Sequence, residues 1–251
     1  MRRLRAYLFV VFLAIWASFF IFLNQRYYPV ILMYHSINPS LKGTPTVSKE
    51  TFIRQMEFIK RHHYKVVSLE KMAGLIKAKK PLYHLVAITF DDGDEDNLEA
   101  AKILARFHYP ATIFMIVKNI DKEGFLSQAE LKYILQRTPV SIGSHTLTHA
   151  YLPSLSYFQL EKEIVLSKMR LEDMLGVKIK EISYPVGGFN EDVLRIVENA
   201  GYCCGCATNR GRGKSVYALK RIKVGPHDLG FRLWIKLSGF YNAFRRYKSP
   251  Y

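Results

Sequence analysis

Two adjacent aspartates and two nearby histidines are the residues of this sequence best suited to chemistry. Asp91 and Asp92 directly follow an apolar run of strand length, residues 85–90. Carboxylates held side by side at the end of a buried strand repel each other and lose solvation, so they require a nearby cation. His145 and His149 are four residues apart, a spacing that lets two imidazoles reach one ion.

One carboxylate and two imidazoles would leave coordination positions open for water, as in catalytic metal sites. The second aspartate would then be free to act as a base. Each pattern alone has a simpler interpretation: an Asp-Asp-Gly triplet is most often a solvated turn, and a His-x-x-x-His pair is more often incidental. The prediction of a catalytic metal site therefore depends on finding both patterns at neighbouring strand ends.

Apolar runs of strand length alternate with segments of helical periodicity along the chain. The expected strands lie near 30–34, 65–69, 85–90, 111–117, 140–142, 202–207 and 222–224. The expected helices lie near 50–59, 69–77, 97–107, 127–136, 157–175 and 191–199. This alternation predicts an α/β fold with a parallel sheet, open or closed into a barrel, and functional residues at the C-terminal ends of the strands.

Three stretches resemble the motifs of a known enzyme family. Residues 89–93 (TFDDG), 144–149 (SHTLTH) and 184–190 (YPVGGFN) are similar, in this order, to the first three motifs of the polysaccharide deacetylases, carbohydrate esterase family 4. Residues 32–35 (LMYH) resemble the opening of the branch that acts on poly-N-acetylglucosamine and related glycans. The likeness covers residues 30–224 and implies a distorted (β/α) barrel of the polysaccharide deacetylase type.

The resemblance also implies a role for individual residues. A divalent metal, usually Zn²⁺, would be held by Asp92, His145 and His149. The general base would be Asp91, and the backbone N–H of Val186 would stabilise the oxyanion. Tyr184 and Pro185 of the third motif would contact the substrate.

The general acid has two candidates. In the branch with the Met-Tyr-His opening, the early histidine at the end of the first strand fills this role, which favours His35; the other candidate is His227, in a late Gly-Pro-His-Asp segment. The sequence departs from the family at two positions. Ser183 stands where an arginine often contacts the base aspartate, so the orientation of Asp91 is left open. Asp94 replaces an aromatic residue and either alters a wall that contacts substrate or adds a surface charge.

The N-terminal sequence predicts a membrane anchor. Residues 6–23 contain no charged side chain and approach the roughly 20 residues that a helix needs to cross a bilayer. Arginines at positions 2, 3 and 5 precede them, so residues 1–5 are expected in the cytoplasm and the chain from residue 24 outside it. A cleaved signal peptide is the alternative, but bulky residues continue to position 23, which favours an uncleaved transmembrane signal-anchor and a single-pass membrane protein.

The remaining chain divides into a linker, 24–29, a polysaccharide deacetylase domain, 30–230, and a basic aromatic C-terminal segment, 231–251. This last segment either packs against the barrel or lies on the membrane surface. Cys203, Cys204 and Cys206 lie within four positions, too close together for a disulfide framework, and are expected as small hydrophobic residues of a strand.

Composition narrows the class of partner. The chain has 37 Lys and Arg against 21 Asp and Glu, and this net charge of +16 predicts attraction to anionic surfaces. A metal-dependent nuclease usually has a second metal and more carboxylates, so no nucleic acid is expected. The expected partner is an acetylated polysaccharide, such as poly-N-acetylglucosamine, peptidoglycan or a chitin-like glycan, from which N-acetyl groups are removed. The alternatives are an O-acetyl polysaccharide esterase and a catalytically silent, membrane-tethered glycan-binding module.

Overall fold

A parallel sheet forms the centre of the molecule. The computed structural model describes residues 7, 9–16, 18, 28–40, 46–208, 210, 215–243, 245, 246 and 248–250. The sheet has eight strands in the order β7-β6-β5-β4-β3-β1-β8, with β2 also paired to β3. They are β1 (Val30–Tyr34), β2 (Lys65–Val66), β3 (Leu85–Phe90), β4 (Ala111–Met115), β5 (Val140–Ser144), β6 (Glu181–Ser183), β7 (Cys204–Cys206) and β8 (Ile222–Lys223). All of these pairings are parallel.

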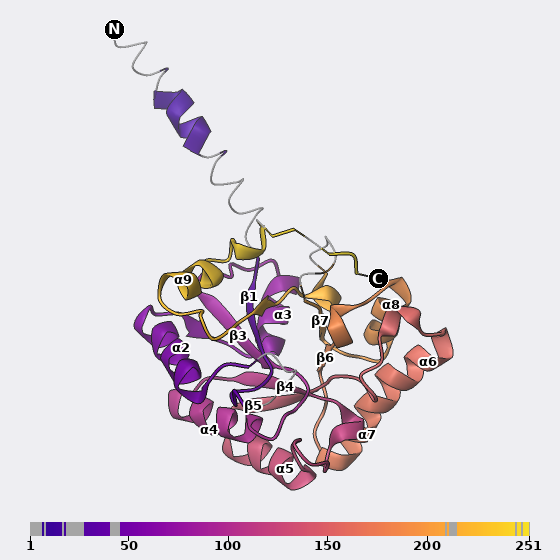
Figure 1. The fold of residues 1–251 in the computed structure, drawn as a ribbon. Helices are drawn as coiled ribbons and strands as arrows, with labels where there is room; N and C mark the ends of the chain where they lie inside the picture. The colour runs from indigo at the N-terminus through magenta and orange to yellow at the C-terminus, as the bar shows by residue number, and fades with distance from the viewer. Residues whose placement is uncertain are drawn as a thin grey trace.

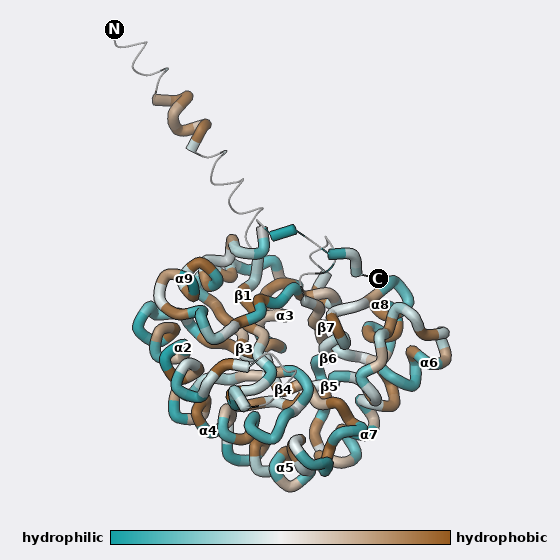
Figure 2. The backbone as a smooth tube through the Cα atoms, in the orientation of Figure 1, coloured by the Kyte–Doolittle hydropathy of each residue, from teal (hydrophilic) through white to brown (hydrophobic). Residues whose placement is uncertain are grey.

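Helices surround the sheet as an outer ring (Figure 1). They are α2 (Lys49–Arg61), α3 (Leu69–Lys77), α4 (Asn97–Phe107), α5 (Gln128–Arg137), α6 (Tyr157–Glu161), α7 (Ser167–Leu175), α8 (Glu191–Asn199) and α9 (Phe231–Leu237). Ser48, Ser68 and Ser127 start three of them by accepting a backbone N–H with the side chain. Figure 2 shows hydrophilic and hydrophobic residues alternating along these helices, as expected where one face covers a core.

The sheet curves into a half-barrel with an irregular seam. β7 and β8 lie at the two ends of the strand order, and a bridge between Cys206 and Leu219 connects the two sides. Two backbone hydrogen bonds support it, from Leu219 to Gly205 and from Ala207 to Leu219, each 2.8 Å long. The predicted α/β architecture with a parallel sheet is confirmed, and its distortion is located at this seam.

The pairing of β1 with β3 fixes the level of the candidate site. Tyr34 lies opposite Phe90, so His35 and Asp91 follow at the same edge of the sheet. The backbone N–H of Asp91 donates to the carbonyl oxygen of Tyr34 at 3.0 Å. Below this edge the buried rings of Tyr34, Phe52 and Phe90 pack with centroids 5.2 to 5.7 Å apart. The edge that carries the polar residues therefore rests on a tightly packed aromatic cluster.

The structure interrupts one expected helix. The segment predicted as a continuous helix over 157–175 consists of α6, a π-helical stretch η3 (Lys162–Leu166) and α7. The prediction of one continuous helix did not distinguish this π-helical stretch. Such stretches occur frequently at functional sites. The expected strand over 65–69 is also shorter, because Ser68 already serves as the N-cap of α3.

The expected membrane anchor is described only in part. Residues 7, 9–16 and 18 are helical. Within the described part of the chain, no helix has both the length and the apolar character that crossing a membrane requires. The other positions of 6–23, the basic end at 1–5 and linker positions 24–27 lie outside the described residues.

The C-terminal segment packs against the barrel, which was one of its two predicted arrangements. Leu233 and Leu237 of α9 are fully buried in the core. Just beyond α9, the carbonyl oxygen of Gly239 accepts a hydrogen bond from the N–H of Tyr28 at 2.9 Å. The chain that enters β1 therefore lies against the chain that leaves α9.

Candidate active site

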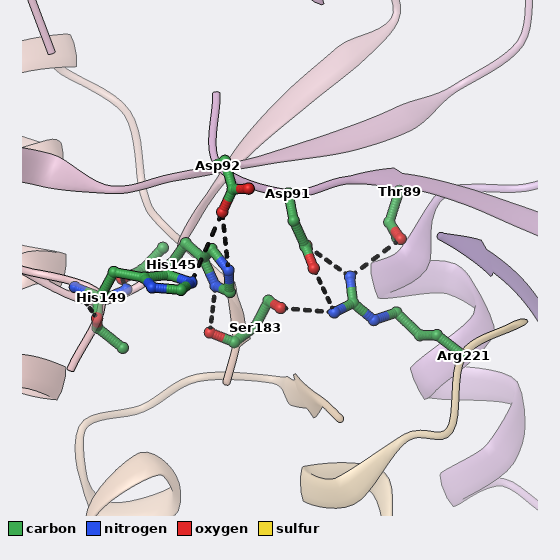
Figure 3. Close-up of polar contacts among 9 residues, drawn as sticks. Thr89, Asp91, Asp92, His145, His149, Ser183 and Arg221 are labelled. Atoms are coloured by element: carbon green, nitrogen blue, oxygen red, sulfur yellow. Dashed lines mark hydrogen bonds and ion pairs between the residues drawn. The ribbon is translucent and has the colours of Figure 1, made fainter. Parts of the chain in front are cut away.

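A buried ion pair holds Asp91 at the end of β3. The residues Asp91 and Arg221 are 3% and 1% exposed. Two N–H groups of the Arg221 guanidinium donate to the two carboxylate oxygens of Asp91, each at 2.6 Å (Figure 3). The Nε–H of Arg221 donates to the carbonyl oxygen of Ala207 at 3.0 Å. This bidentate contact fixes the plane of the carboxylate.

The surroundings of Asp91 keep it ionised. Burial by itself raises the pKa of Asp91, but Arg221 and then His145 lower it, and the resulting pKa lies well below the usual range. Burial lowers the pKa of Arg221, but Asp91 raises it, and the resulting pKa of Arg221 lies above its usual value. Both groups are therefore charged at physiological pH, and each is the counterion of the other.

Arg221 orients Asp91, a role that the third motif had left unassigned because Ser183 stands in place of an arginine. Ser183, at the position where an arginine is frequent, accepts a hydrogen bond from Arg221 with its hydroxyl oxygen at 2.8 Å. The Arg221 guanidinium thus reaches Asp91 from the segment before β8, whereas Ser183 belongs to β6 near the other end of the strand order. Sequence reasoning missed Arg221 because it is 130 positions from Asp91.

Asp92, His145 and His149 converge beside this ion pair (Figure 3). A carboxylate oxygen of Asp92 lies 3.5 Å from Nε2 of His145 and 3.6 Å from Nε2 of His149. The three ligand atoms lie within 4.8 Å of one another. The two shorter separations are long for hydrogen bonds, whereas two ligands about 2.1 Å from a tetrahedral Zn²⁺ are about 3.4 Å apart. The donor set that the sequence predicted is therefore brought together and fits a divalent metal.

A second contact orients His145 for metal binding. Its Nδ1 lies 2.8 Å from the backbone oxygen of Ser183, an acceptor that requires the proton on Nδ1 and leaves Nε2 free. Burial lowers the pKa of His145 to about 4, so the ring is neutral at pH 7. Burial and then the neighbouring Asp91 raise the pKa of Asp92. A cation at Asp92 would offset both unfavourable effects on its charged form.

Glu163 holds the loop that carries both histidines. One carboxylate oxygen of Glu163 accepts the N–H groups of Leu147 and Thr148 at 3.0 and 2.9 Å. The other accepts the hydroxyl of Thr148 at 2.7 Å. Within this loop Thr146 and His149 have φ values of 68° and 66°, which residues other than glycine rarely adopt and which surrounding contacts must maintain. Glu163 is buried in η3, and its role was not predicted from the sequence.

The two candidate acids lie in different environments. Burial lowers the pKa of His35, and Asp91 and Asp92 partly offset this effect. The register of β1 against β3 puts His35 at the same edge of the sheet as Asp91. The backbone oxygen of His35 accepts a hydrogen bond from the side-chain amide of the buried Asn97 at 2.7 Å. His227 is exposed in the turn after β8. This placement favours His35.

Val186 occupies a strained position. Its φ of 58° and ψ of 3° are left-handed values. For a β-branched residue these are rare and cost on the order of 1–3 kcal/mol. The Val186 side chain is exposed, and its carbonyl oxygen accepts a hydrogen bond from Nε of Arg210 at 3.0 Å. Such strain clusters at active sites, and the expected oxyanion role of the Val186 N–H stays a prediction.

Two residues expected to contact substrate are instead part of the core. Tyr184 is 1% exposed, and its hydroxyl donates to the carbonyl oxygen of Tyr217. Pro185 is also buried. Packing covers both side chains in this structure, and the expected contact of Tyr184 and Pro185 with substrate stays a prediction. Asp94 is buried too, so it is no surface charge; burial, followed by the nearby carboxylates, raises its pKa to about 7.

Comparisons with known proteins show which sequences this chain resembles. The sequence model of a family described as polysaccharide deacetylase matches residues 78–205. YxkH of Bacillus subtilis, named as a polysaccharide deacetylase, is 37% identical over 201 residues, which cover 78% of this chain and 71% of YxkH. Poly-beta-1,6-N-acetyl-D-glucosamine N-deacetylase of Staphylococcus aureus is 29% identical over 170 residues, 62% of this chain and 59% of that enzyme.

A solved structure shares the architecture. The deacetylase PplD of Streptococcus pyogenes, in complex with acetate, superposes with a TM-score of 0.77 at 26% sequence identity. The match covers 83% of this chain and 97% of PplD. The half-barrel and its helical ring are therefore the fold of a known deacetylase structure.

We expect Arg221→Met to destabilise the protein by about 3–5 kcal/mol at pH 7, because it leaves the buried Asp91 carboxylate without a counterion. The pKa of an aspartate in the unfolded chain is about 3.9, and in the wild type the pKa of Asp91 in the folded state is lower. Asp91 therefore contributes stability at pH values above about 3.9, and this stability is lost only as the pH falls through the folded-state pKa. In the variant burial raises that pKa, so stability falls as pH rises. Urea unfolding at pH 7 and pH 4 should show a smaller difference from wild type at pH 4.

The matched control is Arg137→Met, at an exposed position at the end of α5. It should remain within about 0.5 kcal/mol of the wild type at both pH values. An Arg221→Met variant that behaves like this control would show that the ion pair does not govern the charge of Asp91.

We expect Glu163→Gln to weaken Zn²⁺ binding about 10- to 100-fold, because contacts that orient metal ligands typically contribute this much. Titration calorimetry with zinc alone measures the effect without reference to activity. Glu161→Gln, an exposed neighbour in α6, is the control and should bind zinc like the wild type. Equal affinity in the two variants would mean that the loop keeps its shape without the Glu163 carboxylate.

Proposed function

Because the chain belongs to the polysaccharide deacetylase family, we propose that it removes N-acetyl groups from an amino-sugar polysaccharide outside the cytoplasm, such as poly-N-acetylglucosamine, peptidoglycan or a chitin-like glycan. The observation that carries this proposal is the convergence of Asp92, His145 and His149 beside the ion pair of Asp91 and Arg221. The Staphylococcus aureus relative, named for N-deacetylation of poly-N-acetylglucosamine, supports an N-acetyl substrate.

The donor set supports a divalent metal as the cofactor. Asp92, His145 and His149 would hold it, and one carboxylate with two imidazoles suits Zn²⁺ and leaves coordination positions open. When bound, such an ion lowers the pKa of a water and polarises the carbonyl of the substrate. The neutral, oriented ring of His145 is prepared for this role before a metal arrives.

Asp91 is proposed to accept the proton of the attacking water. Each of its carboxylate oxygens accepts one hydrogen bond from Arg221, which leaves further lone pairs for a proton. The ion pair lowers the basicity of Asp91, since it lowers its pKa. In return the carboxylate is ionised and oriented before the substrate binds.

Val186 and His35 are proposed to act on the two sides of the bond that breaks. The Val186 N–H would donate to the acetyl oxygen as that oxygen becomes negatively charged. His35 would give a proton to the leaving nitrogen, and cleavage of the C–N bond would then release acetate and a free amine. The pairing of β1 with β3, which puts His35 at the same edge as Asp91, supports this assignment.

The N-terminal sequence supports an extracytoplasmic, membrane-tethered location. Residues 6–23 are uncharged and follow a basic end. The described side chains of Phe9, Phe12 and Trp16 in this segment are exposed. A bilayer would cover them, and the tether would keep the deacetylase domain beside polymers of the cell envelope.

We expect the full-length chain, purified in detergent and loaded with Zn²⁺, to release acetate from N-acetylglucosamine oligomers. Removal of the metal by a chelator should slow release at least about 100-fold, and zinc should restore it, because the water would lose its activating ion. A coupled acetate assay measures both rates. Release only from O-acetylated xylan would move the activity to esters, and release from neither would favour a glycan-binding role.

We expect His35→Ala to lower kcat on N-acetylglucosamine oligomers about 10²- to 10⁴-fold with little change in KM, because the leaving amine must be protonated. A p-nitrophenyl acetate ester, whose leaving group needs no proton, should be cleaved by this variant at close to the wild-type rate. His227→Ala is the control and should keep wild-type rates on both substrates. The reverse pattern would assign the acid to His227.

A further inference from the structure

Helix α9 presents aromatic side chains away from the core. Phe231 is 70% exposed and Trp234 is 47% exposed, and their rings stack with centroids 5.7 Å apart at an angle of 15°. Ile235 extends this exposed apolar face, while Leu233 and Leu237 are buried on the other side. The helix is therefore fixed to the barrel by one face and leaves an apolar face uncovered.

A hollow beside α9 enlarges this surface. A cavity of about 380 Å³ is lined by Phe58 of α2 and His62, which directly follows α2, together with Gly230, Phe231 and Trp234. The surface formed by the half-buried Phe58 and the exposed His62, Phe231, Trp234 and Ile235 is called the α9 patch below. It combines residues from two helices that are distant in sequence. Contiguous exposed apolar surfaces of this kind mark interaction sites.

Basic residues are neighbours in sequence of the α9 patch residues. Lys60 and Arg61 are exposed in the last turn of α2, and Arg232 is exposed on α9. The nearby carboxylate of Asp228 is paired with Lys236 at 2.6 Å, so it does not offset these charges. Aromatic rings at headgroup level and cations attracted to anionic lipids are the two features of a surface that rests on a bilayer.

The chain connection brings the α9 patch close to the N-terminal apolar segment. Tyr28 is hydrogen-bonded to Gly239, two residues beyond the end of α9. Four residues lie between position 23 and Tyr28, and the five steps from one to the other span at most about 18 Å even when fully extended. Figure 1 shows the described turns of the N-terminal helix and α9 on the same side of the molecule. A bilayer that contains residues 6–23 would therefore lie within reach of α9.

We infer that the α9 patch is a second membrane contact, which docks onto the surface of an anionic bilayer beside the N-terminal segment. The inference rests on the membrane tether in the proposed function but not on the deacetylation chemistry. Two contacts at the same side hold the barrel in one orientation, whereas a tether alone lets it rotate. The opening of the active site then keeps a constant direction relative to the membrane.

The tryptophans of the chain make a direct test possible. The sequence contains two, Trp16 and Trp234. In the full-length Trp16→Phe variant, Trp234 is the single indole. We expect its emission to shift to shorter wavelength in vesicles of anionic phospholipid and to fall at least about twofold when the acyl chains are brominated, since interfacial aromatic residues lie at the acyl boundary.

A matched control moves the indole to the far side. The variant Trp16→Phe/Trp234→Phe/Tyr133→Trp carries it on α5, where Tyr133 is 44% exposed, at the opposite edge of the ring (Figure 1). Bromine quenching of Trp234 without quenching of the control supports the inference. Equal quenching at the two positions, or none at Trp234, overturns it.

A glycan is the competing occupant, and the same fluorophore identifies it. If N-acetylglucosamine oligomers shift the emission of Trp234 in detergent while brominated lipid has no effect, the α9 patch binds sugar and the inference is wrong. Acetate release from soluble oligomers tests the proposed function separately, because the substituted residues lie outside the active site. Failure of the membrane contact would leave that release unchanged.

Discussion

The buried ion pair between Arg221 and Asp91 is the interaction on which the rest of the site depends. Two adjacent carboxylates at the end of a buried strand cannot both stay ionised without compensation. Arg221 compensates Asp91 and leaves the carboxylate of Asp92 available to a metal. The guanidinium also contacts the hydroxyl of Ser183, whose backbone oxygen orients His145. The proposed base and the proposed metal ligands thus share one hydrogen-bonded scaffold.

The same ion pair links the site to the closure of the fold. Arg221 directly precedes β8, donates to the carbonyl of Ala207 beyond β7, and reaches Asp91 on β3. It therefore bridges the seam where the half-barrel is least regular. A buried ion pair adds little net stability, yet removal of one partner is costly because the other charge remains buried. The stability of the seam therefore helps to keep Asp91, the proposed base, in its orientation.

Features of the fold and site that follow from local sequence pattern could be predicted from the sequence. Features that depend on contacts between distant residues could not. Asp92 and the two histidines were identifiable because each directly follows an apolar run or lies in a short motif. Arg221 and Glu163 were not, because their partners lie 130 and 15 or 16 positions away. Tyr184 belongs to a motif and was expected at the substrate, but core packing decides its position. Alternating elements predicted a parallel sheet, whereas the neighbour of β8 is set by long-range pairing with β1.

The central claim is that Arg221 gives Asp91 and Asp92 different roles, with Asp91 as the base and Asp92 as a metal ligand. It is tested most directly by counting the zinc bound to full-length Asp91→Asn and Asp92→Asn proteins after equilibrium dialysis, alongside acetate release. The account predicts that Asp91→Asn binds zinc like the wild type but releases no acetate, whereas Asp92→Asn retains roughly a tenth or less of the zinc affinity. Loss of zinc from Asp91→Asn with retention in Asp92→Asn, or equal binding by both, would contradict it.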